Sequence, residues 1–205
     1  MILTRAVASL VSNMRELEVN ETPERVVLLD EQGRACGAAR KDEVHHEDTP
    51  LHMAFSCHVL DDRGRLLITR RALGKAAWAG TWTNAFCGHP EPFEPVPDAV
   101  VRRARQELGL ELEGLRLLLP DFRYRAVDAS GVVENEVCPV YIARAASAPQ
   151  LNPDEAMDAQ WVEPEDLADA LAAAPWAFSP WLVLQAKEMS AGADQISADA
   201  WRGAA

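Results

Sequence analysis

The sequence lacks any long hydrophobic run, and its basic residues are far outnumbered by acidic ones. No stretch approaches the roughly 20 apolar residues of a membrane-spanning helix, so we expect no membrane partner. Lysine and arginine total 20 against 32 aspartates and glutamates, which gives a formal net charge of -12 at pH 7. Binding to nucleic acid depends on Lys and Arg that neutralise phosphates, and this balance argues against such a partner. A small anionic substrate is still compatible, because it needs only a few well-placed cations.

Cysteine is also scarce, with 4 residues in 205 and no Cys-x-x-Cys pair. A chain with 48% hydrophobic residues can bury a core without disulfides, and we interpret its cysteines as reduced thiols of a cytoplasmic protein. We expect Cys57 and Cys138 to be packing residues, and we assign no function to Cys36. Cys87, in contrast, lies in a motif that indicates chemistry.

The order of predicted elements indicates one domain with extensions at both ends. The apolar residues near the N-terminus have helical spacing and no signal-peptide cleavage site follows them, so we interpret residues 1–24 as an arm or short helix. The folded domain is predicted over residues 25–190. The end of the chain, residues 191–205, is rich in Ala, Gly and Ser and is predicted to be a frayed tail.

Hydrophobic periodicity and turn residues divide this domain into strands and helices. Strands are predicted over Arg25–Asp30, Leu51–Leu60, Arg65–Arg70, Trp82–Phe86, Phe122–Val127, Val132–Ala143 and Ala159–Val162. Helices are predicted over Pro97–Leu108, Pro164–Ala174 and Ser179–Met189, with Gly109 as the cap of the first helix. Glu43–Thr49 is a predicted loop. This order favours an α/β fold of the α+β kind, in which mixed β-sheets are flanked by helices.

The loop and helix that follow Cys87 contain a spaced motif. Gly88 is followed after five residues by Glu94 and after seven more by Arg102, and the run Arg103-Ala104-Arg105-Gln106-Glu107-Leu108-Gly109-Leu110 comes next. This spacing resembles the Nudix box, in which helix carboxylates hold a divalent cation that binds a diphosphate. Two acidic positions of the box are replaced, by Arg103 and Gln106, whereas Glu107 keeps its carboxylate. We therefore expect the Nudix fold without the hydrolytic metal array.

A second group of residues indicates a transition-metal site. His45, His52 and His89 flank predicted strands. Glu134 and Glu136 are two residues apart on one predicted strand, so both carboxylates face the same way. Imidazole ligands favour Mn, Fe or Zn over Mg, and convergence of these five side chains would create such a site.

Five separated runs carry the most specific signal. They are Thr69-Arg70-Arg71-Ala72, Thr83-Asn84-Ala85-Phe86-Cys87-Gly88-His89-Pro90, Asp121-Phe122-Arg123-Tyr124-Arg125, Glu134-Asn135-Glu136-Val137 and Trp176-Ala177-Phe178-Ser179-Pro180-Trp181. In order and spacing the chain resembles the type 1 isopentenyl-diphosphate isomerases, a Nudix branch with a degenerate box, from about Arg25 to Ala186. The resemblance implies an enzyme that interconverts isopentenyl and dimethylallyl diphosphate by adding a proton at one carbon and removing one from another.

The resemblance also implies the functions of individual residues. Cys87 and Glu136 match the proton-moving pair; Glu136 with the phenol of Tyr124 is assigned to the donating side, and Cys87 to the abstracting side. The ligands of a first metal, Mn²⁺ or Zn²⁺, match His45, His52, His89, Glu134 and Glu136. A second metal, Mg²⁺ that arrives with the substrate, matches Glu107 and the backbone carbonyl of Cys87.

For the substrate itself, the resemblance implies a cationic site and an aromatic wall. Arg71, Lys75 and Arg103 match the residues that bind the diphosphate, and Trp181 matches the tryptophan whose ring faces a carbocation. No flavin is expected, and the protein is expected to be a monomer or a weak dimer.

Two other functions compete with this interpretation: a Nudix hydrolase of a nucleoside or other diphosphate, and a Nudix-like binding module without activity. The replaced acidic positions disfavour the first, and the combination of Cys87 with Glu136 disfavours the second. Other residues are expected to be structural or solvated. These are His46 and His58 as core or surface residues, Trp78, Trp82, Trp161 and Trp176 as core or pocket-wall residues, and Asp128 and Glu155 as solvated acids.

Overall fold

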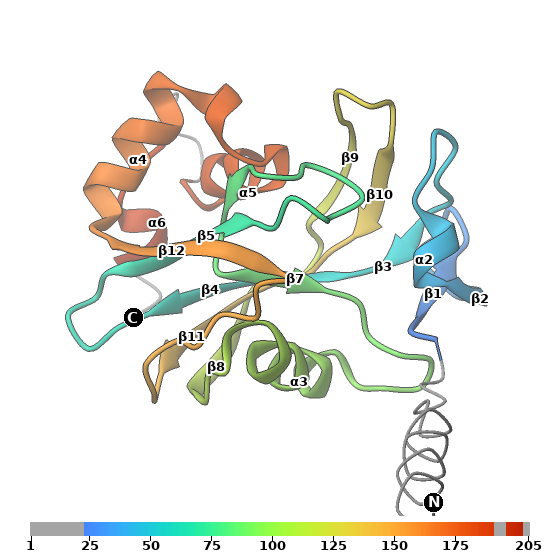
Figure 1. Ribbon diagram of the computed structural model, residues 1–205, viewed down its shortest axis with the longest axis horizontal. Helices are drawn as coiled ribbons and strands as arrows, with labels where there is room; N and C mark the ends of the chain where they lie inside the picture. The colour runs from blue at the N-terminus through green and yellow to red at the C-terminus, as the bar shows by residue number, and fades with distance from the viewer. Residues whose placement is uncertain (1–22, 191–195, 203–205) are drawn as a thin grey trace, which may run out of the picture.

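The computed structural model describes residues 23–190 and 196–202, and its strands form two mixed β-sheets (Figure 1). The five-stranded sheet has the order β2-β1-β3-β10-β9. Its strands are β1 (Arg25–Leu29), β2 (Ala35–Arg40), β3 (His52–Met53), β9 (Arg123–Val127) and β10 (Val133–Val137). The predicted arm over residues 1–24 lies outside the described residues, apart from Pro23 and Glu24.

The seven-stranded sheet has the order β12-β5-β4-β11-β8, with β6 paired to β5 and β7 paired to β4. Its strands are β4 (Phe55–Leu60), β5 (Leu66–Arg71), β6 (Trp82–Thr83), β7 (Phe86–Gly88), β8 (Leu112–Leu119), β11 (Val140–Ala145) and β12 (Ala156–Val162). This arrangement confirms the expected mixed sheets of an α+β fold.

Two segments that were each predicted as one strand pass from one sheet into the other. The segment Leu51–Leu60 divides at Ala54 into β3 and β4, and Val132–Ala143 divides at Cys138 into β10 and β11. The halves pair in parallel, β3 with β10 and β4 with β11. The Ala54 amide donates to the Val137 carbonyl at 2.9 Å, which joins the two segments where they leave the first sheet. Ala54 and Cys138 therefore mark the junction between the two sheets.

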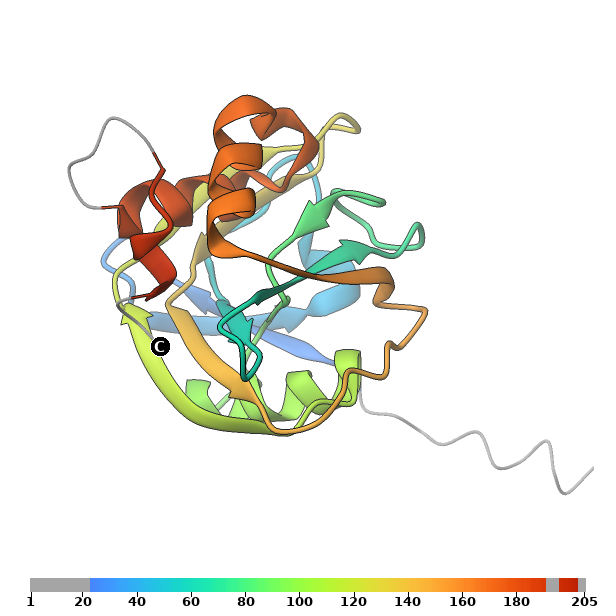
Figure 2. The same ribbon diagram turned by 90° about the vertical axis from the view of Figure 1, so that its left-hand side faces the viewer.

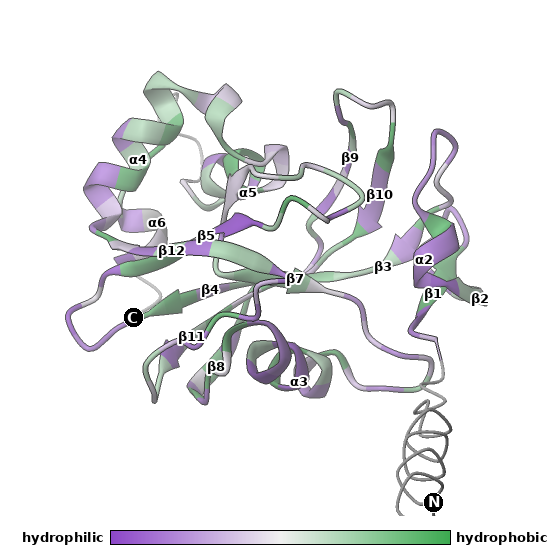
Figure 3. Ribbon diagram, viewed as in Figure 1, coloured by the Kyte–Doolittle hydropathy of each residue, from purple (hydrophilic) through white to green (hydrophobic). Residues whose placement is uncertain are grey.

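Helices cover both faces of the seven-stranded sheet (Figure 2). On one face lies α3 (Val96–Leu108), which ends at Gly109 with a left-handed φ of 57°, as predicted. On the other lie α4 (Pro164–Ala173), the short η1 (Pro175–Ala177), α5 (Pro180–Met189) and α6 (Asp199–Arg202). The strand β4 between them is buried along its length and hydrophobic at most positions (Figure 3). Phe55, Cys57 and Val59 pack with α3, whereas Leu60 packs with α4 to α6.

Several expectations fail where tertiary contacts decide the structure. The prediction of a frayed tail is wrong for residues 199–202, because they form α6 and the Trp201 side chain is fully buried in the core with α4 and α5. A short helix, α2 (Lys41–Val44), forms at the start of the predicted loop over Glu43–Thr49. The strands β2 and β8 had no matching prediction. Trp176 is not a core or pocket residue, since it is 85% exposed.

None of the helices in the described residues is long and apolar enough to cross a membrane.

Candidate functional site

A cavity of about 400 Å³ lies beside the junction of the two sheets. Its wall brings together residues that the sequence assigned to catalysis, metal binding and substrate binding. They are His45, Arg71, Lys75, Cys87, His89, Arg103, Tyr124, Glu134, Glu136 and Trp181. Two further predicted residues, His52 and Glu107, are buried beside this wall.

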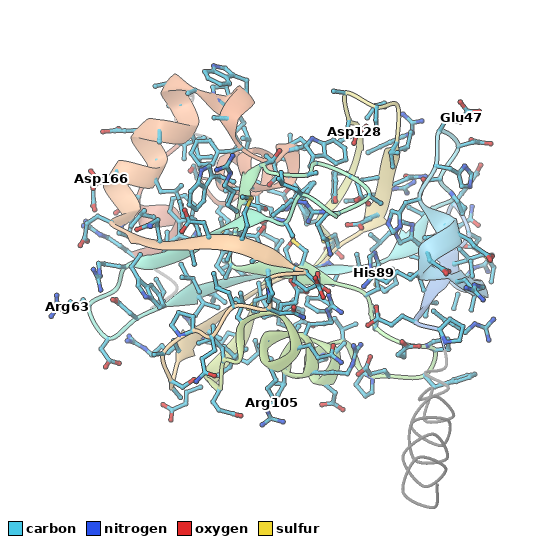
Figure 4. The ribbon with its side chains drawn as sticks, viewed as in Figure 1. Glu47, Arg63, His89, Arg105, Asp128 and Asp166 are labelled. Carbon is cyan, nitrogen blue, oxygen red and sulfur yellow. The ribbon has the colours of Figure 1, made fainter. Side chains whose placement is uncertain are left out.

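Three histidines and two carboxylates lie close together at one end of the cavity. His45 follows α2, His52 lies on β3, and His89 follows β7, where Figure 4 labels it near the centre of the view. Their ring centroids are 5.1 to 5.4 Å apart. The parallel register of β3 and β10 pairs His52 with Glu136. The Nε2 atoms of His52 and His89 lie 3.5 and 3.3 Å from Glu136 Oε1, and His45 Nε2 lies 3.3 Å from Glu134 Oε2.

The chemistry of this cluster fits a bound cation. Ligand atoms of His45, His52, His89 and Glu136 all lie within 4.8 Å of one another. His52 Nδ1 is 2.9 Å from the Pro50 carbonyl, so its proton lies there and Nε2 offers a lone pair. Within the described residues, the buried His52 Nε2 and Glu134 Oε2 have no hydrogen-bond partner. Such unsatisfied buried atoms are costly unless a ligand pairs them.

The protonation states of the cluster follow from burial and from neighbouring charges. Burial lowers the pKa of His89 to about 3, which keeps the ring neutral, as a metal ligand must be. Burial and the adjacent Glu136 raise the pKa of Glu134. Burial alone would raise the pKa of Glu136 too, but the His52 and His89 rings beside its carboxylate hold it well below the ordinary value. Glu136 is therefore the carboxylate that stays ionised.

Cys87 lies on β7 with its thiol between two polar side chains. Ser56 Oγ is 3.2 Å from the sulfur, and the thiol donates to Asn84 Oδ1 at 3.4 Å. Burial raises the pKa of Cys87 to about 12, so the resting side chain carries its proton. Cys57 and Cys138 are fully buried, as expected of packing residues.

Aromatic side chains form another part of the cavity wall. Tyr124 on β9 is the cross-strand partner of Glu136, and its ring centroid lies 5.8 Å from that of Trp181. The Trp181 indole donates to Asn84 Oδ1 at 3.0 Å, which fixes the orientation of the ring. The Arg71 guanidinium lies 5.3 Å from the centre of the same ring. Arg71 and Trp181 thus share one surface of the cavity.

Of the predicted diphosphate cations, Arg103 and Lys75 are held by carboxylates, whereas Arg71 donates to the Ala77 carbonyl. Arg103 Nη2 is 2.7 Å from Glu107 and 2.9 Å from Glu155, and Nη1 is 3.1 Å from Glu24. Lys75 pairs with Glu155 at 2.5 Å. Glu107, expected to hold Mg²⁺, is therefore bound to Arg103. Glu155 is not the solvated acid that the sequence indicated, since its side chain is only 17% exposed between two cations.

Sequence reasoning also missed Lys41 and Glu24. Lys41 begins α2, lines the cavity and pairs with Glu24 at 2.5 Å. Their pairing could not be predicted, because Glu24 and Lys41 are 17 residues apart in the sequence. The spacing of Lys41 from His45, one helical turn, was the available signal.

Glu94 and Arg102, the two charged residues with the matched Nudix spacing, form an ion pair next to the loop that carries His89. Arg102 donates to both oxygens of Glu94 and also to the His89 carbonyl, which ties the loop after β7 to α3. Gly88 has no room for a side chain, since an added Cβ would lie 2.9 Å from both Arg103 and Phe55. The glycine therefore lets Arg103 reach the cavity.

Comparisons with known proteins agree with this geometry. The NUDIX domain model matches residues 50–182. The chain is 66% identical to the isopentenyl-diphosphate Delta-isomerase of Agromyces mediolanus over 80% of each chain. It is 62% identical to that of Clavibacter michiganensis subsp. michiganensis, over 79% of this chain and 84% of the relative. The crystal structure of DR0079 from Deinococcus radiodurans, 22% identical with a TM-score of 0.63, covers 80% of this chain and 98% of its own and shares the fold. The chain therefore belongs to the Nudix superfamily and, within it, to the isopentenyl-diphosphate Delta-isomerase family.

Proposed function

We propose that this protein interconverts isopentenyl diphosphate and dimethylallyl diphosphate in isoprenoid biosynthesis. The observation that carries the proposal is one cavity that holds a buried thiol, an ionised carboxylate and a cationic end. The reaction adds a proton at one carbon and removes one from another, so no bond to phosphorus breaks. A thiol and a carboxylate are sufficient as the groups that give and take these protons.

Cys87 and Glu136, assisted by Tyr124, are the proposed catalytic residues. In the resting protein the Cys87 thiol holds a proton and Glu136 does not, because burial raises the pKa of the thiol to about 12. A turnover that starts from this state uses Cys87 as the donor. A turnover in the other direction starts from a protonated Glu136, and Cys87 then removes the proton, which is the assignment that the sequence indicated.

The histidine and carboxylate cluster is proposed to hold Mn²⁺ or Zn²⁺ through His45, His52, His89, Glu134 and Glu136. The lone pair on buried His52 Nε2 and the unpaired Glu134 oxygen support this set. A cation bound there would neutralise the two adjacent carboxylates. The protein's own contribution is to keep His89 neutral by burial and to orient His52 through the Pro50 carbonyl.

Lys75, Arg103 and Arg71 are proposed to bind the diphosphate, and Lys41 is added to them because it lines the same cavity. Mg²⁺ accompanying the diphosphate is assigned to Glu107 and the Cys87 carbonyl. Glu107 is paired with Arg103 in this structure. When Arg103 binds the diphosphate, the Glu107 carboxylate would become free to bind Mg²⁺. Trp181 is proposed to face the carbocation, a contact of about 2 kcal/mol when desolvated.

One assay tests this function. The protein is incubated with isopentenyl diphosphate and Mg²⁺, and dimethylallyl diphosphate and free phosphate are both measured. We expect the isomer without phosphate; phosphate without the isomer would show a hydrolase instead. Cys87→Ala should abolish turnover and keep metal binding, whereas Cys36→Ala, at an exposed thiol, should have no effect.

A further inference from the structure

A line of buried hydrogen bonds leads from the C-terminal helix α6 to the sulfur of Cys87. It begins at Trp201, whose side chain is fully buried. The Trp201 indole Nε1 lies 3.3 Å from His58 Nδ1. Because an indole N–H can only donate, His58 Nδ1 must be the acceptor. The single proton of the neutral His58 ring therefore lies on Nε2.

The position of this proton determines the donor and the acceptor in the next two hydrogen bonds, which are made by Gln185. His58 Nε2 donates to Gln185 Oε1 at 3.1 Å, which identifies the oxygen side of that amide. The other side, Gln185 Nε2, donates to Ser56 Oγ at 2.8 Å. An amide nitrogen cannot accept, so the Ser56 hydroxyl proton is excluded from this contact and must point elsewhere. Gln185 and Ser56 are both fully buried, and water does not compete.

The acceptor left for the Ser56 hydroxyl proton is sulfur. Cys87 Sγ is 3.2 Å from Ser56 Oγ, and Cys138 Sγ is slightly farther at 3.4 Å. The strands fix these distances, because Ser56 on β4 is the cross-strand partner of Cys87 on β7. The hydroxyl therefore has a rigid backbone support and a defined direction.

The opposite side of Cys87 has the complementary polarity. Asn84 Nδ2 donates to the carbonyls of Cys57 and Phe86 at 3.0 and 2.8 Å, so its Oδ1 faces the other way. That oxygen accepts from the Cys87 thiol. The sulfur thus lies between one acceptor, suited to its protonated form, and one donor, suited to the form that has lost its proton.

We propose that Ser56 is a positioning residue for Cys87, because its hydroxyl proton is directed at the sulfur during proton transfer. Gln185, His58 and Trp201 impose that direction, which makes α6 part of the support of the site. The inference rests on the proposed function, in which Cys87 gives and takes a proton.

Kinetics of single variants test the positioning. Ser56→Ala should lower kcat about tenfold to hundredfold, as expected for a hydrogen bond to a charging group, and leave KM for isopentenyl diphosphate nearly unchanged. Trp201→Phe keeps the packing but removes the first donor, and should lower kcat about threefold. Ser147→Ala is the control, because that exposed hydroxyl accepts from the Glu111 amide and takes no part in this line of hydrogen bonds. An unchanged kcat in Ser56→Ala, with the protein folded, overturns the proposal.

A second measurement does not depend on activity. Nitrogen NMR of the imidazole rings should show His58 with its proton on Nε2, and Trp201→Phe should introduce the other tautomer. A proton on His58 Nδ1 in the wild-type protein would overturn the proposed direction of the hydrogen bonds, even if Ser56→Ala lowered kcat. Failure of the function itself is recognised separately, because the wild-type protein would then form no dimethylallyl diphosphate from isopentenyl diphosphate.

Discussion

Arg102 donates to the two carboxylate oxygens of Glu94 at 2.8 and 2.7 Å, and the same guanidinium donates to the His89 carbonyl at 3.1 Å. One side chain therefore joins α3 to the loop that carries a proposed metal ligand. Arg102→Lys keeps the positive charge but cannot form the bidentate pair with Glu94. It should cost about 1–2 kcal/mol of stability and weaken metal binding about tenfold, measured by urea unfolding and by metal titration.

A matched control lies on the same helix. Arg105 also forms a two-pronged pair, with Glu111 at 2.9 and 2.8 Å, but both side chains are more than half exposed. Figure 4 shows Arg105 pointing away from the molecule. Arg105→Lys should change stability by less than about 0.5 kcal/mol. Equal losses in the two variants would contradict a special function of the Arg102 pair.

The sequence predicted those parts of the site that depend on spacing along the chain. The alternation of Glu134 and Glu136 specifies neighbours on one strand. The spacing from Gly88 to Arg102 specifies a loop that leads from β7 into α3. The sequence did not predict the division of Leu51–Leu60 at Ala54, because the apolar pattern continues across the point where the strand changes sheets. Glu155 and Trp201 were misjudged for a related reason: their partners, Arg103 and His58, are distant in the sequence.

The proposed first metal should stabilise the fold. At a concentration one hundred times its dissociation constant, a cation that binds only the folded state adds about 2.7 kcal/mol. His45→Ala should remove most of this gain, because it deletes one imidazole from the cluster. His46→Ala is the control, since the neighbouring ring is exposed and lies outside the cluster. Thermal unfolding with Mn²⁺, Zn²⁺ or Mg²⁺ measures the gain and ranks the metals; a full gain in His45→Ala would contradict the assignment.

Stability should fall in mild acid because of His58. Burial lowers its pKa from 6.5 to about 4, so the folded protein keeps this ring neutral. The unfolded chain takes up the proton as the pH falls below 6.5, and unfolding is then favoured. The contribution is complete above pH 6.5 and is lost at about 1.4 kcal/mol per pH unit down to about pH 4.

His58→Gln separates this effect from other titrations, because the amide keeps a donor and an acceptor but does not titrate. Urea unfolding of both proteins at about pH 7 and about pH 5 gives the measurement. The wild-type protein should lose about 2 kcal/mol more than the variant over this interval. A difference between the two proteins that does not change with pH would contradict the prediction.

Glu155 should compete with the substrate for its cations. Burial alone would raise its pKa, but Lys75 and Arg103 lower it to about 2, so the carboxylate is ionised and bound to both. Glu155→Gln removes that charge, which should destabilise the folded protein by about 1–2 kcal/mol and free Lys75 and Arg103 for an anion. The dissociation constant for inorganic diphosphate, measured by calorimetry, should fall about threefold to tenfold. Asp154→Asn is the matched control, because this adjacent acid is exposed and should change neither quantity. Weaker diphosphate binding in Glu155→Gln would instead mean that Glu155 orients the two cations for the substrate.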